Sequence, residues 1–203
     1  MSTNWKDYKI NGRDFKDLIH PSGTDEKKYF NSGLLDANKI KEECNFGDNS
    51  KILEYGCGNG RILTHLQNYN IYGVDLVQDF LDDANKNGIK NLYNIKEELL
   101  KSFEIIFCYT VFIHLSDEDT INALKYIYDK LKIKGRAYLQ IPLYEKQTNH
   151  DGNFICVRTW ETKNIFSILE NIGFKILDFK VNTGKFNYYN IGKNHNNFLI
   201  LSR

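Results

Sequence analysis

The first feature that indicates chemistry is a run of alternating glycines, Gly56, Gly58 and Gly60, in the stretch KILEYGCGNGRILTHL that begins at Lys51. Glycine has no Cβ, so a turn of this kind lets a ligand lie close to the backbone. An apolar run precedes the glycines and a helical pattern follows them, so the first N–H groups of a helix should face that ligand. Glu54 adds a carboxylate two residues before the first glycine. The stretch therefore predicts a small-molecule site with one negatively charged wall.

Two classes of ligand use such a turn, dinucleotides and S-adenosylmethionine. The dinucleotide fingerprint is G-x-G-x-x-G, with a pyrophosphate on the helix N-terminus. Here the spacing is G-x-G-x-G, and Glu54 would repel a pyrophosphate but attract the amino group of a methionine moiety. Asp75 closes the next strand pattern, where an acid accepts hydrogen bonds from the ribose hydroxyls of either ligand. The alternative is a plain tight turn without a ligand, with Asp75 as an exposed acid at a strand end.

Short apolar runs alternate with helical patterns from residue 51 onward, and these elements must position the glycine loop. Strands are predicted over 51–55, 71–76, 91–95, 103–112, 136–141, 174–181 and 197–203. Helices are predicted over 61–68, 77–87, 116–132 and 162–173, with Ser116 as an N-cap and with Gly88 and Gly173 at two helix ends. Strands that alternate with helices form a mostly parallel sheet covered on both faces. The last two strands have no helix between them and should pair antiparallel.

The first 45 residues differ from the rest in pattern. Short helices are predicted over 12–19 and 34–44, among scattered aromatic residues. We expect residues 1–45 to form a helical cap on a cofactor-binding α/β core of residues 46–203, with the whole of 1–203 as a single domain.

Four motifs in order resemble those of class I S-adenosylmethionine-dependent methyltransferases. ILEYGCGNGRILTHL is similar to their motif I, YGVDL to the acidic end of their second strand, FEIIFCYTVFIHLSDED to their fourth strand and its loop, and LKIKGRAYLQIP to their fifth strand. The resemblance covers most of the chain, roughly from Leu34 to the C-terminus. It implies a three-layer α/β fold whose seven-stranded sheet has the order 3-2-1-4-5-7-6, with strand 7 antiparallel.

The same resemblance implies the contacts to S-adenosylmethionine. Residues that would line its methionine half are Glu54, Gly56, Cys57, Gly58 and Gly60. Asp75 would hold the ribose, Leu76 would flank the adenine, and Tyr109 would border the transferring methyl group. Tyr29 would cover the cofactor from the cap. The acidic residue that the family often carries near the adenine amine has no clear counterpart, and Glu97 and Glu98 are the candidates.

His114 is the candidate general base, because it follows the predicted strand over 103–112 closely, at the rim where a methyl acceptor would lie. A hydroxyl or ammonium acceptor loses a proton on methylation, and the ordinary pKa of histidine, about 6.5, suits that task. The alternative is a structural histidine that bonds the nearby helix. The remaining histidines are weaker candidates: His20, His65, His150 and His195.

The acceptor pocket is expected between the cap, the loop that contains His114 and the long segment 142–160, because long loops in compact domains are often functional. The predicted substrate-binding residues are Gln140, Tyr144, Arg158 and Arg61. Arginine is scarce beside lysine in this chain, so the two arginines favour an anionic acceptor. For each of them the alternative is an exposed surface charge.

Composition argues against several classes of protein. The chain has 203 residues and a net charge of +1, so no overall field attracts nucleic acid or an anionic membrane. No apolar run approaches the ~20 residues that span a bilayer, and the N-terminus has no signal-peptide pattern. The 4 cysteines form no CxxC pair, and no cluster has metal-ligand spacing, so we expect neither a metal nor disulfides. We therefore expect a cytoplasmic protein with reduced thiols.

The preferred hypothesis is methylation of an oxygen or nitrogen of a small polar metabolite, such as a sugar, a sugar nucleotide or a natural-product or polysaccharide intermediate. The stretch YTVFIHL stands where enzymes that methylate nucleic-acid amines carry (D/N)-P-P-(Y/F). An RNA or protein methyltransferase should show a basic stripe or an added recognition domain, and neither is evident. The glycine spacing and Glu54 argue against a nicotinamide-dependent oxidoreductase. The last alternative is a non-catalytic partner subunit that binds the cofactor. The sequence does not predict the oligomeric state.

Overall fold

A computed structural model describes residues 25–144, 148–151, 156–182 and 196–203, and among these the side chains outside 145–157 and 181–196. The cap helix predicted over 12–19 and His20 lie outside the described residues. The side chains of His150 and His195 also lie outside them.

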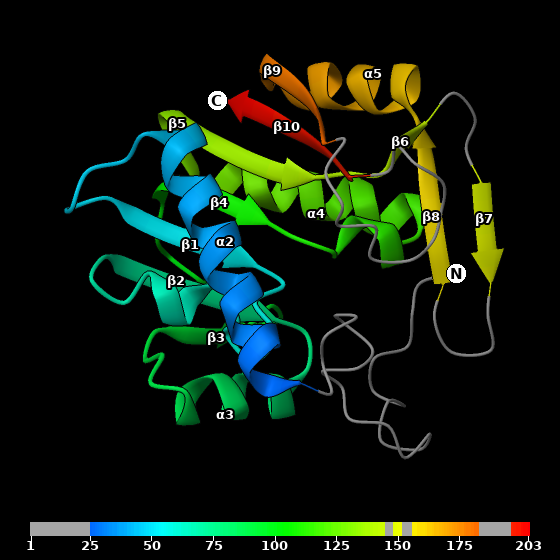
Figure 1. Ribbon diagram of the computed structural model, residues 1–203. Helices are drawn as coiled ribbons and strands as arrows, with labels where there is room; N and C mark the ends of the chain where they lie inside the picture. The colour runs from blue at the N-terminus through cyan, green and yellow to red at the C-terminus, as the bar shows by residue number, and fades with distance from the viewer. Residues whose placement is uncertain (1–24, 145–147, 152–155, 183–195) are drawn as a thin grey trace.

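A seven-stranded sheet forms the centre of the described structure (Figure 1). Its strands are β1 Lys51–Tyr55, β2 Asn70–Asp75, β3 Leu92–Asn94, β4 Phe103–Cys108, β5 Leu131–Gln140, β9 Lys175–Asn182 and β10 Asn196–Ser202. The order is β3-β2-β1-β4-β5-β10-β9. The pairs from β3 to β5 are parallel, and β10 runs antiparallel to both β5 and β9. This arrangement confirms the predicted order 3-2-1-4-5-7-6 with the last strand antiparallel.

Helices cover both faces of the sheet, which gives three layers. On one face lie α2 Glu26–Cys44 and α3 Gln78–Lys86, and on the other lie α4 Asp117–Lys130 and α5 Thr162–Ile172. Successive strand residues point to opposite faces, so the adjacent β1 residues Ile52 and Leu53 join different cores. Ile52 packs in the cluster that contains Ile40 of α2, and Leu53 packs in the cluster that contains Leu124 of α4.

Local capping explains where the helices begin and end. The Ser116 side chain accepts a hydrogen bond from the Asp119 N–H at 3.1 Å, so the predicted N-cap of α4 is confirmed. Gly173 ends α5 as predicted, in a left-handed conformation with φ 112°. The helix α2 begins at Glu26 rather than at the predicted residue 34, because Asp25 caps it by accepting from the Lys28 N–H at 3.0 Å.

The helix predicted over 61–68 is wrong. Only one 3₁₀ turn, η2 Leu63–His65, follows the glycine loop. Side chains compete for the backbone here: the Thr64 hydroxyl donates to the Arg61 carbonyl at 3.1 Å, and His65 Nε2 lies 2.7 Å from the Phe30 carbonyl oxygen. The backbone therefore closes only short turns, such as the one in which the His65 N–H donates to the Ile62 carbonyl at 3.0 Å, and the cap helix holds the segment through Phe30.

Two other boundaries differ from the prediction. The fourth strand ends at Cys108 and not at residue 112, because Thr110 turns the chain with a left-handed φ of 55° and a 3₁₀ turn, η3 Phe112–His114, follows. The segment 142–160, predicted as a loop, contains a small sheet of β6 Leu143–Tyr144, β8 Cys156–Glu161 and β7 Thr148–Asp151 in the order β6-β8-β7. These strands are too short to produce a clear alternation in the sequence.

The parallel strands β1, β2, β3 and β4 direct their carboxyl ends to one edge of the sheet. Ligands of open α/β sheets bind at this edge. Between β3 and β4, residues 95–102 are all described and form no helix. The edge is therefore bordered by α2 on one face and by the start of α4 on the other.

Candidate functional site

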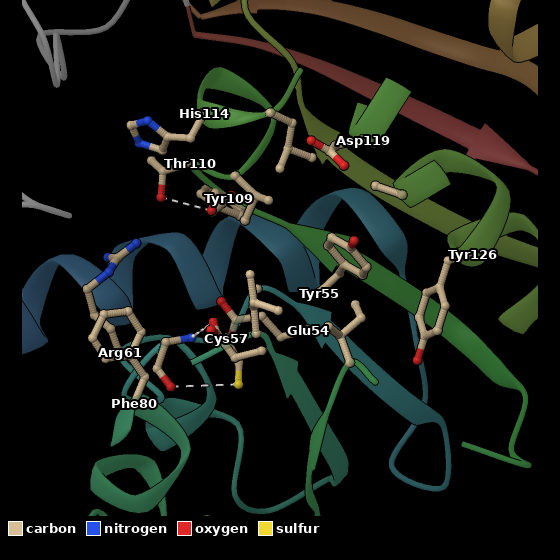
Figure 2. Close-up of a pocket in the computed structure, with 18 of the residues that line it drawn as sticks. Glu54, Tyr55, Cys57, Arg61, Phe80, Tyr109, Thr110, His114, Asp119 and Tyr126 are labelled. Carbon is tan, nitrogen blue, oxygen red and sulfur yellow. Dashed lines mark hydrogen bonds between the residues drawn. The ribbon is translucent and has the colours of Figure 1, made fainter. Parts of the chain in front are cut away.

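A pocket of about 450 Å³ lies at the carboxyl ends of β1, β2 and β4 (Figure 2). Its lining comes from the glycine loop, from the ends of these strands, from the β4–α4 loop and from the first turns of α2 and α4. In Figure 2, His114 and Arg61 lie toward one side of the pocket and Tyr126 lies toward the other. The pocket is therefore shared between the cap helix and both faces of the sheet.

The glycine loop needs its glycines for geometry. Gly56, Gly58 and Gly60 have positive φ values of 75°, 52° and 80°. A Cβ on Gly56 would lie 2.2 Å from Cγ2 of Val111, so the β4–α4 loop packs directly on this backbone. A Cβ on Gly60 would lie 3.1 Å from Cγ1 of Ile89, which follows α3. Two of the glycines thus serve close packing as well as the turn.

Most backbone N–H groups of this loop donate hydrogen bonds to other groups of the protein and not to the pocket. The N–H groups of Gly56 and Cys57 both donate to the Val74 carbonyl, at 2.8 and 3.0 Å. The Gly58 N–H donates to Asp75 at 2.8 Å. A phosphate site needs such N–H groups directed at the ligand. The loop accordingly presents a bare surface and not a phosphate cradle, which corrects the expectation of helix N–H groups facing the ligand.

Glu54 places a buried carboxyl group in the pocket. The side chain is only 3% exposed, and its Oε2 atom has no hydrogen-bond partner among the described residues. Burial raises the pKa of this carboxyl well above its usual range, and the Arg61 guanidinium opposes that rise. An unpartnered buried acid destabilises a protein by itself. The arrangement is suited to a ligand that brings a positively charged donor.

Asp75 connects the loop to the end of β2. Its Oδ2 accepts from the Gly58 N–H at 2.8 Å and its Oδ1 from the Val77 N–H at 2.9 Å. Burial raises the pKa of Asp75, and these backbone donors oppose the rise. Each carboxylate oxygen can accept a second hydrogen bond, so the group can hold a diol while it continues to orient the loop.

The cap helix is fastened to the loop by buried polar contacts. The Tyr29 hydroxyl donates to Oδ1 of Asn59 at 2.7 Å, and Tyr29 itself is fully buried. The Arg61 guanidinium lies 2.7 Å from the Asp36 carboxylate and donates to the Ser32 hydroxyl at 2.9 Å. A Cβ on Gly33 would lie 2.1 Å from the Arg61 carbonyl oxygen, so only glycine lets α2 approach this closely.

The loop after β4 forms the opposite wall. Tyr109 is buried at the end of the strand, and Thr110 follows in a left-handed conformation, which a β-branched residue adopts only under constraint. The constraint is a hydrogen bond from the Thr110 N–H to Oε1 of Gln140 at 2.8 Å. His114 is 2% exposed, and its backbone N–H donates to the Val111 carbonyl at 2.8 Å.

Most of the residues predicted from the sequence line this one pocket. They are Tyr29, Glu54, Gly56, Cys57, Gly58, Arg61, Asp75, Leu76, Tyr109 and His114. Gly60 does not line it and instead packs against α3 and Ile89. Glu97 and Glu98, the candidates for the adenine amine, are exposed and lie outside the lining.

The structure does not bring the other predicted substrate residues into the pocket. Gln140 lies beneath the β4–α4 loop and holds Thr110. Tyr144 is 44% exposed on β6, and Arg158 of β8 is buried and pairs with Asp117 at the start of α4. None of these three is among the lining residues.

One wall of the pocket consists of residues that were not predicted from the sequence. The α4 residues Asp119, Asn122, Ala123 and Tyr126 line the pocket, together with Tyr55, Phe80, Ile95, Thr110, Val111 and Leu115. Their spacing of i, i+3, i+4 and i+7 marks one helix face. The apolar residues Ile121, Leu124 and Ile127 dominate the periodicity of α4, so the neighbouring polar face gives no comparable signal in the sequence. Alternation along β1 places Tyr55 on the opposite face from Glu54, where its ring lies 5.6 Å from that of Tyr126 of α4.

The described residues offer neither a metal site nor a disulfide. In that part of the chain no group of three or more His, Cys, Asp or Glu side chains could hold a metal ion. Cys44, Cys57 and Cys108 are free and buried. None of the described helices is both long and apolar enough to cross a membrane.

Comparison with known proteins points to one family. Residues 52–135, from β1 to Gly135, match the model of a methyltransferase domain. The ubiquinone biosynthesis O-methyltransferases of two strains of Rickettsia bellii are 28% identical over 170 residues, which cover 70% of this chain and 68% of theirs.

Solved structures share the fold at low sequence identity. An S-adenosylmethionine-dependent methyltransferase from Clostridium acetobutylicum has a TM-score of 0.63 and 17% identity, with 88% of this chain and 92% of that chain covered. An amino pentose methyltransferase from Micromonospora echinaspora, bound to S-adenosylmethionine, has a TM-score of 0.62 and 13% identity, with 86% and 92% covered. These likenesses concern the fold.

Proposed function

We propose that the chain is a class I S-adenosylmethionine-dependent methyltransferase and that it methylates an oxygen or nitrogen of a small polar metabolite. The acceptor classes are a sugar, a sugar nucleotide and a natural-product or polysaccharide intermediate. One observation carries the proposal: His114 is 2% exposed and lines the same pocket as Glu54 and the glycine loop. A proton acceptor thus borders the space in which the methionine half of the cofactor fits.

The hydrogen-bond acceptors of the pocket fit S-adenosylmethionine. The Oε2 atom of Glu54, which lacks a partner among the described residues, matches the amino group of the methionine moiety, and Asp75 matches the ribose diol. When bound, the cofactor supplies a methyl group activated on a sulfonium. The buried aromatic rings of Tyr29 and Tyr109 line the pocket and would exclude water from the methionine half.

The strand order supports one orientation of the cofactor across the edge of the sheet. Across the carboxyl edge, His114 follows β4, Glu54 lies in β1, Asp75 ends β2 and Ile95 follows β3. The strands lie in the order β4, β1, β2, β3. The acceptor, the amino group, the ribose and the adenine would follow one another in this order, with the acceptor next to His114.

His114 would act by taking the proton that a hydroxyl or ammonium group loses when it is methylated. Because a base of suitable pKa must lie within hydrogen-bond reach of that proton, position matters first. The 3₁₀ turn η3 and the N-cap of α4 fix the backbone on both sides of His114. Alignment of the acceptor with the methyl group accounts for the rest of the rate acceleration.

The similar proteins support a small acceptor. The Rickettsia relatives are named as O-methyltransferases of ubiquinone biosynthesis, and one structural neighbour is an amino pentose methyltransferase. The anionic character suggested by Arg61 and Arg158 receives no support, because their guanidinium groups pair with Asp36 and Asp117. The proposal therefore keeps a polar acceptor and does not require it to be negatively charged.

The test begins with calorimetric titration of S-adenosylmethionine and, as a control, NAD. We expect micromolar binding of S-adenosylmethionine alone, weakened at least tenfold in Asp75→Ala. A panel of sugar, sugar-nucleotide and phenolic acceptors is then screened with wild type and with His114→Asn, which keeps polarity but removes the base.

For His114→Asn we expect kcat to fall by about 10²- to 10⁴-fold with little change in cofactor affinity. The pH–rate profile should also lose its lower limb. Binding of NAD in place of S-adenosylmethionine would overturn the assignment. An unchanged pH profile in His114→Asn would leave the enzyme class intact and remove His114 as the base.

A further inference from the structure

Recognition of the adenine is the part of the ligand that the predicted residues leave unexplained. An adenine ring offers a distinctive edge, with an amine that donates and a neighbouring ring nitrogen that accepts. Glu97 and Glu98 are exposed and outside the pocket, so they do not meet this edge. The segment that contains them, 95–102, forms no helix that could cover the sheet next to β3.

The first two turns of α4 also line this pocket. They carry a carboxylate and an amide, which can bond the amine and the ring nitrogen of an adenine edge. Asp119 and Asn122 are three residues apart on the lining face of the helix, where side chains three apart are neighbours. Ala123, 2% exposed, lies next along this face and leaves room beside them. Asp119 is held in place because its Oδ2 accepts from the Ser116 hydroxyl at 2.5 Å.

The neighbouring lining is suited to the faces of a flat ring. Leu76 is 41% exposed although it is a large apolar side chain, and it lines the pocket directly after Asp75. Ile95 is half-buried beyond it, at the end of β3. A ring stacked on these side chains would remove apolar surface from water. Asp119 and Asn122 would then lie toward the edge of the ring.

We propose that Asp119 and Asn122 of α4 recognise the adenine edge of the cofactor. The Asp119 carboxylate accepts from the adenine amine, and the Asn122 side-chain amide donates to the adjacent ring nitrogen. This inference rests on the proposed use of S-adenosylmethionine. It assigns nucleobase specificity to a helix that follows β4 and not to a residue that follows β3.

The test uses base-modified ligands, so it does not depend on turnover. Hypoxanthine replaces the amine by an acceptor oxygen and places a proton on the ring nitrogen, which reverses both hydrogen bonds. We would titrate S-adenosylhomocysteine and S-inosylhomocysteine into wild type, Asn122→Ala and Asp119→Asn by calorimetry. The control variant is Glu118→Ala, an exposed neighbour on the same turn that does not line the pocket.

We expect wild type and Glu118→Ala to bind the adenine ligand about 10- to 100-fold more tightly than the hypoxanthine ligand, as for other paired contacts to a base edge. In Asn122→Ala and Asp119→Asn this preference should fall to within a few-fold. Asn122→Ala replaces an exposed helical residue by the best helix former, so it should fold even if a change at Asp119 weakens the cap of α4.

Two results would contradict the inference and are distinguishable from a failure of the proposed function. Wild type that binds both ligands equally, or variants that retain the full preference, would exclude Asp119 and Asn122 as the readers. Wild type that binds neither ligand would overturn the assignment of the cofactor itself.

Discussion

Glu54 is the residue whose environment most directly indicates a ligand. Its folded-state pKa is raised by burial, so in the absence of a ligand the folded protein binds a proton at Glu54 more readily than the unfolded chain does. The unfolded state then binds fewer protons, and the unfolding free energy falls as the pH rises from the ordinary value of 4.5 toward the raised pKa. The burial of this acid therefore destabilises the ligand-free protein at neutral pH.

Glu54→Gln should remove that dependence. The variant keeps the shape and the burial but cannot ionise, so its stability relative to wild type should increase as the pH rises above 4.5. Urea unfolding of both proteins at several pH values between 5 and 8 measures this difference. The same variant should bind S-adenosylhomocysteine more weakly, because the charge that meets the amino group is lost. A constant stability difference across these pH values would refute the account of Glu54.

Gly56 allows a second test on a single residue. Gly56→Ala combines a left-handed φ of 75° with a Cβ that would lie 2.2 Å from Val111 Cγ2. We expect the unfolding free energy to fall by about 2–4 kcal/mol, because alanine is strained in the left-handed conformation and its Cβ clashes with Val111. Adding Val111→Ala should restore the steric part and leave about 1–2 kcal/mol from the backbone conformation.

The control is Gly47→Ala, which meets no atom within 4 Å and should change stability by less than about 0.5 kcal/mol. If Gly56→Ala were as stable as Gly47→Ala, the close packing of the glycine loop on the β4–α4 loop would be refuted. If the double variant showed no recovery, Val111 would not be the obstacle.

At the scale of secondary-structure elements, the loops and helices that border the pocket are held in place by residues far away in sequence. The loop after β4 is held by Gln140, one strand away. Gln140→Leu would leave the Thr110 N–H without its acceptor, at a cost of about 1–3 kcal/mol. We expect cofactor affinity to change little and kcat to fall, because the wall that contains His114 is no longer fixed.

Gln140→Glu is the matched control for Gln140→Leu in the loop after β4. A carboxylate oxygen can also accept from the Thr110 N–H, so this variant should retain most of the turnover that Gln140→Leu loses. Should both variants instead raise the KM of the acceptor equally and leave kcat unchanged, Gln140 would contact the substrate, as the sequence analysis expected.

The cap helix α2 is the second such element. Tyr29→Phe removes the hydrogen bond to Asn59 and should lower the unfolding free energy by about 0.5–1.5 kcal/mol. Asn59→Ala should show a similar effect, and the double variant should show much less than the sum, because both changes remove one interaction. Chemical denaturation of the four proteins measures the coupling. Additive effects would mean that the Tyr29–Asn59 contact does not fasten α2 to the glycine loop.

The sequence predicted the elements well where periodicity and caps act locally. Ser116 and Gly173 each fix a helix boundary through neighbours in the chain, and the apolar residues of β4 fix where that strand begins. The helix expected over 61–68 failed because the Thr64 hydroxyl occupies the Arg61 carbonyl and because α2, far away in sequence, binds the side chains of Arg61 and His65. A single sequence does not reveal that competition.

The residues of the candidate site likewise fall into those that the sequence predicts and those that depend on how distant elements pack. Glu54, Asp75, Gly56 and Gly58 could be predicted because they belong to short motifs of consecutive residues. Arg61 could be placed at the pocket but its pairing with Asp36 could not be foreseen, since it depends on how the cap packs. The polar face of α4 was missed because its residues are separated by helical spacing and belong to no motif.

For the whole molecule, ligand binding should appear as global stabilisation. The pocket joins α2, the glycine loop, the β4–α4 loop and α4, which belong to both faces of the sheet. A ligand that binds only the folded state at 100 times its Kd stabilises it by about 2.7 kcal/mol. For a chain of 203 residues this corresponds to a rise in Tm of roughly 5–10 °C.

We therefore expect S-adenosylhomocysteine, at a saturating concentration, to raise the Tm of wild type by this amount and NAD to leave it unchanged. Asp75→Ala should lose most of the shift, because the variant loses both the ribose contact and the anchor of the Gly58 N–H. Glu118→Ala should keep the full shift, since this residue does not line the pocket. Equal shifts with both ligands would indicate non-specific stabilisation, whereas a shift with NAD alone would return the glycine loop to the dinucleotide-binding class.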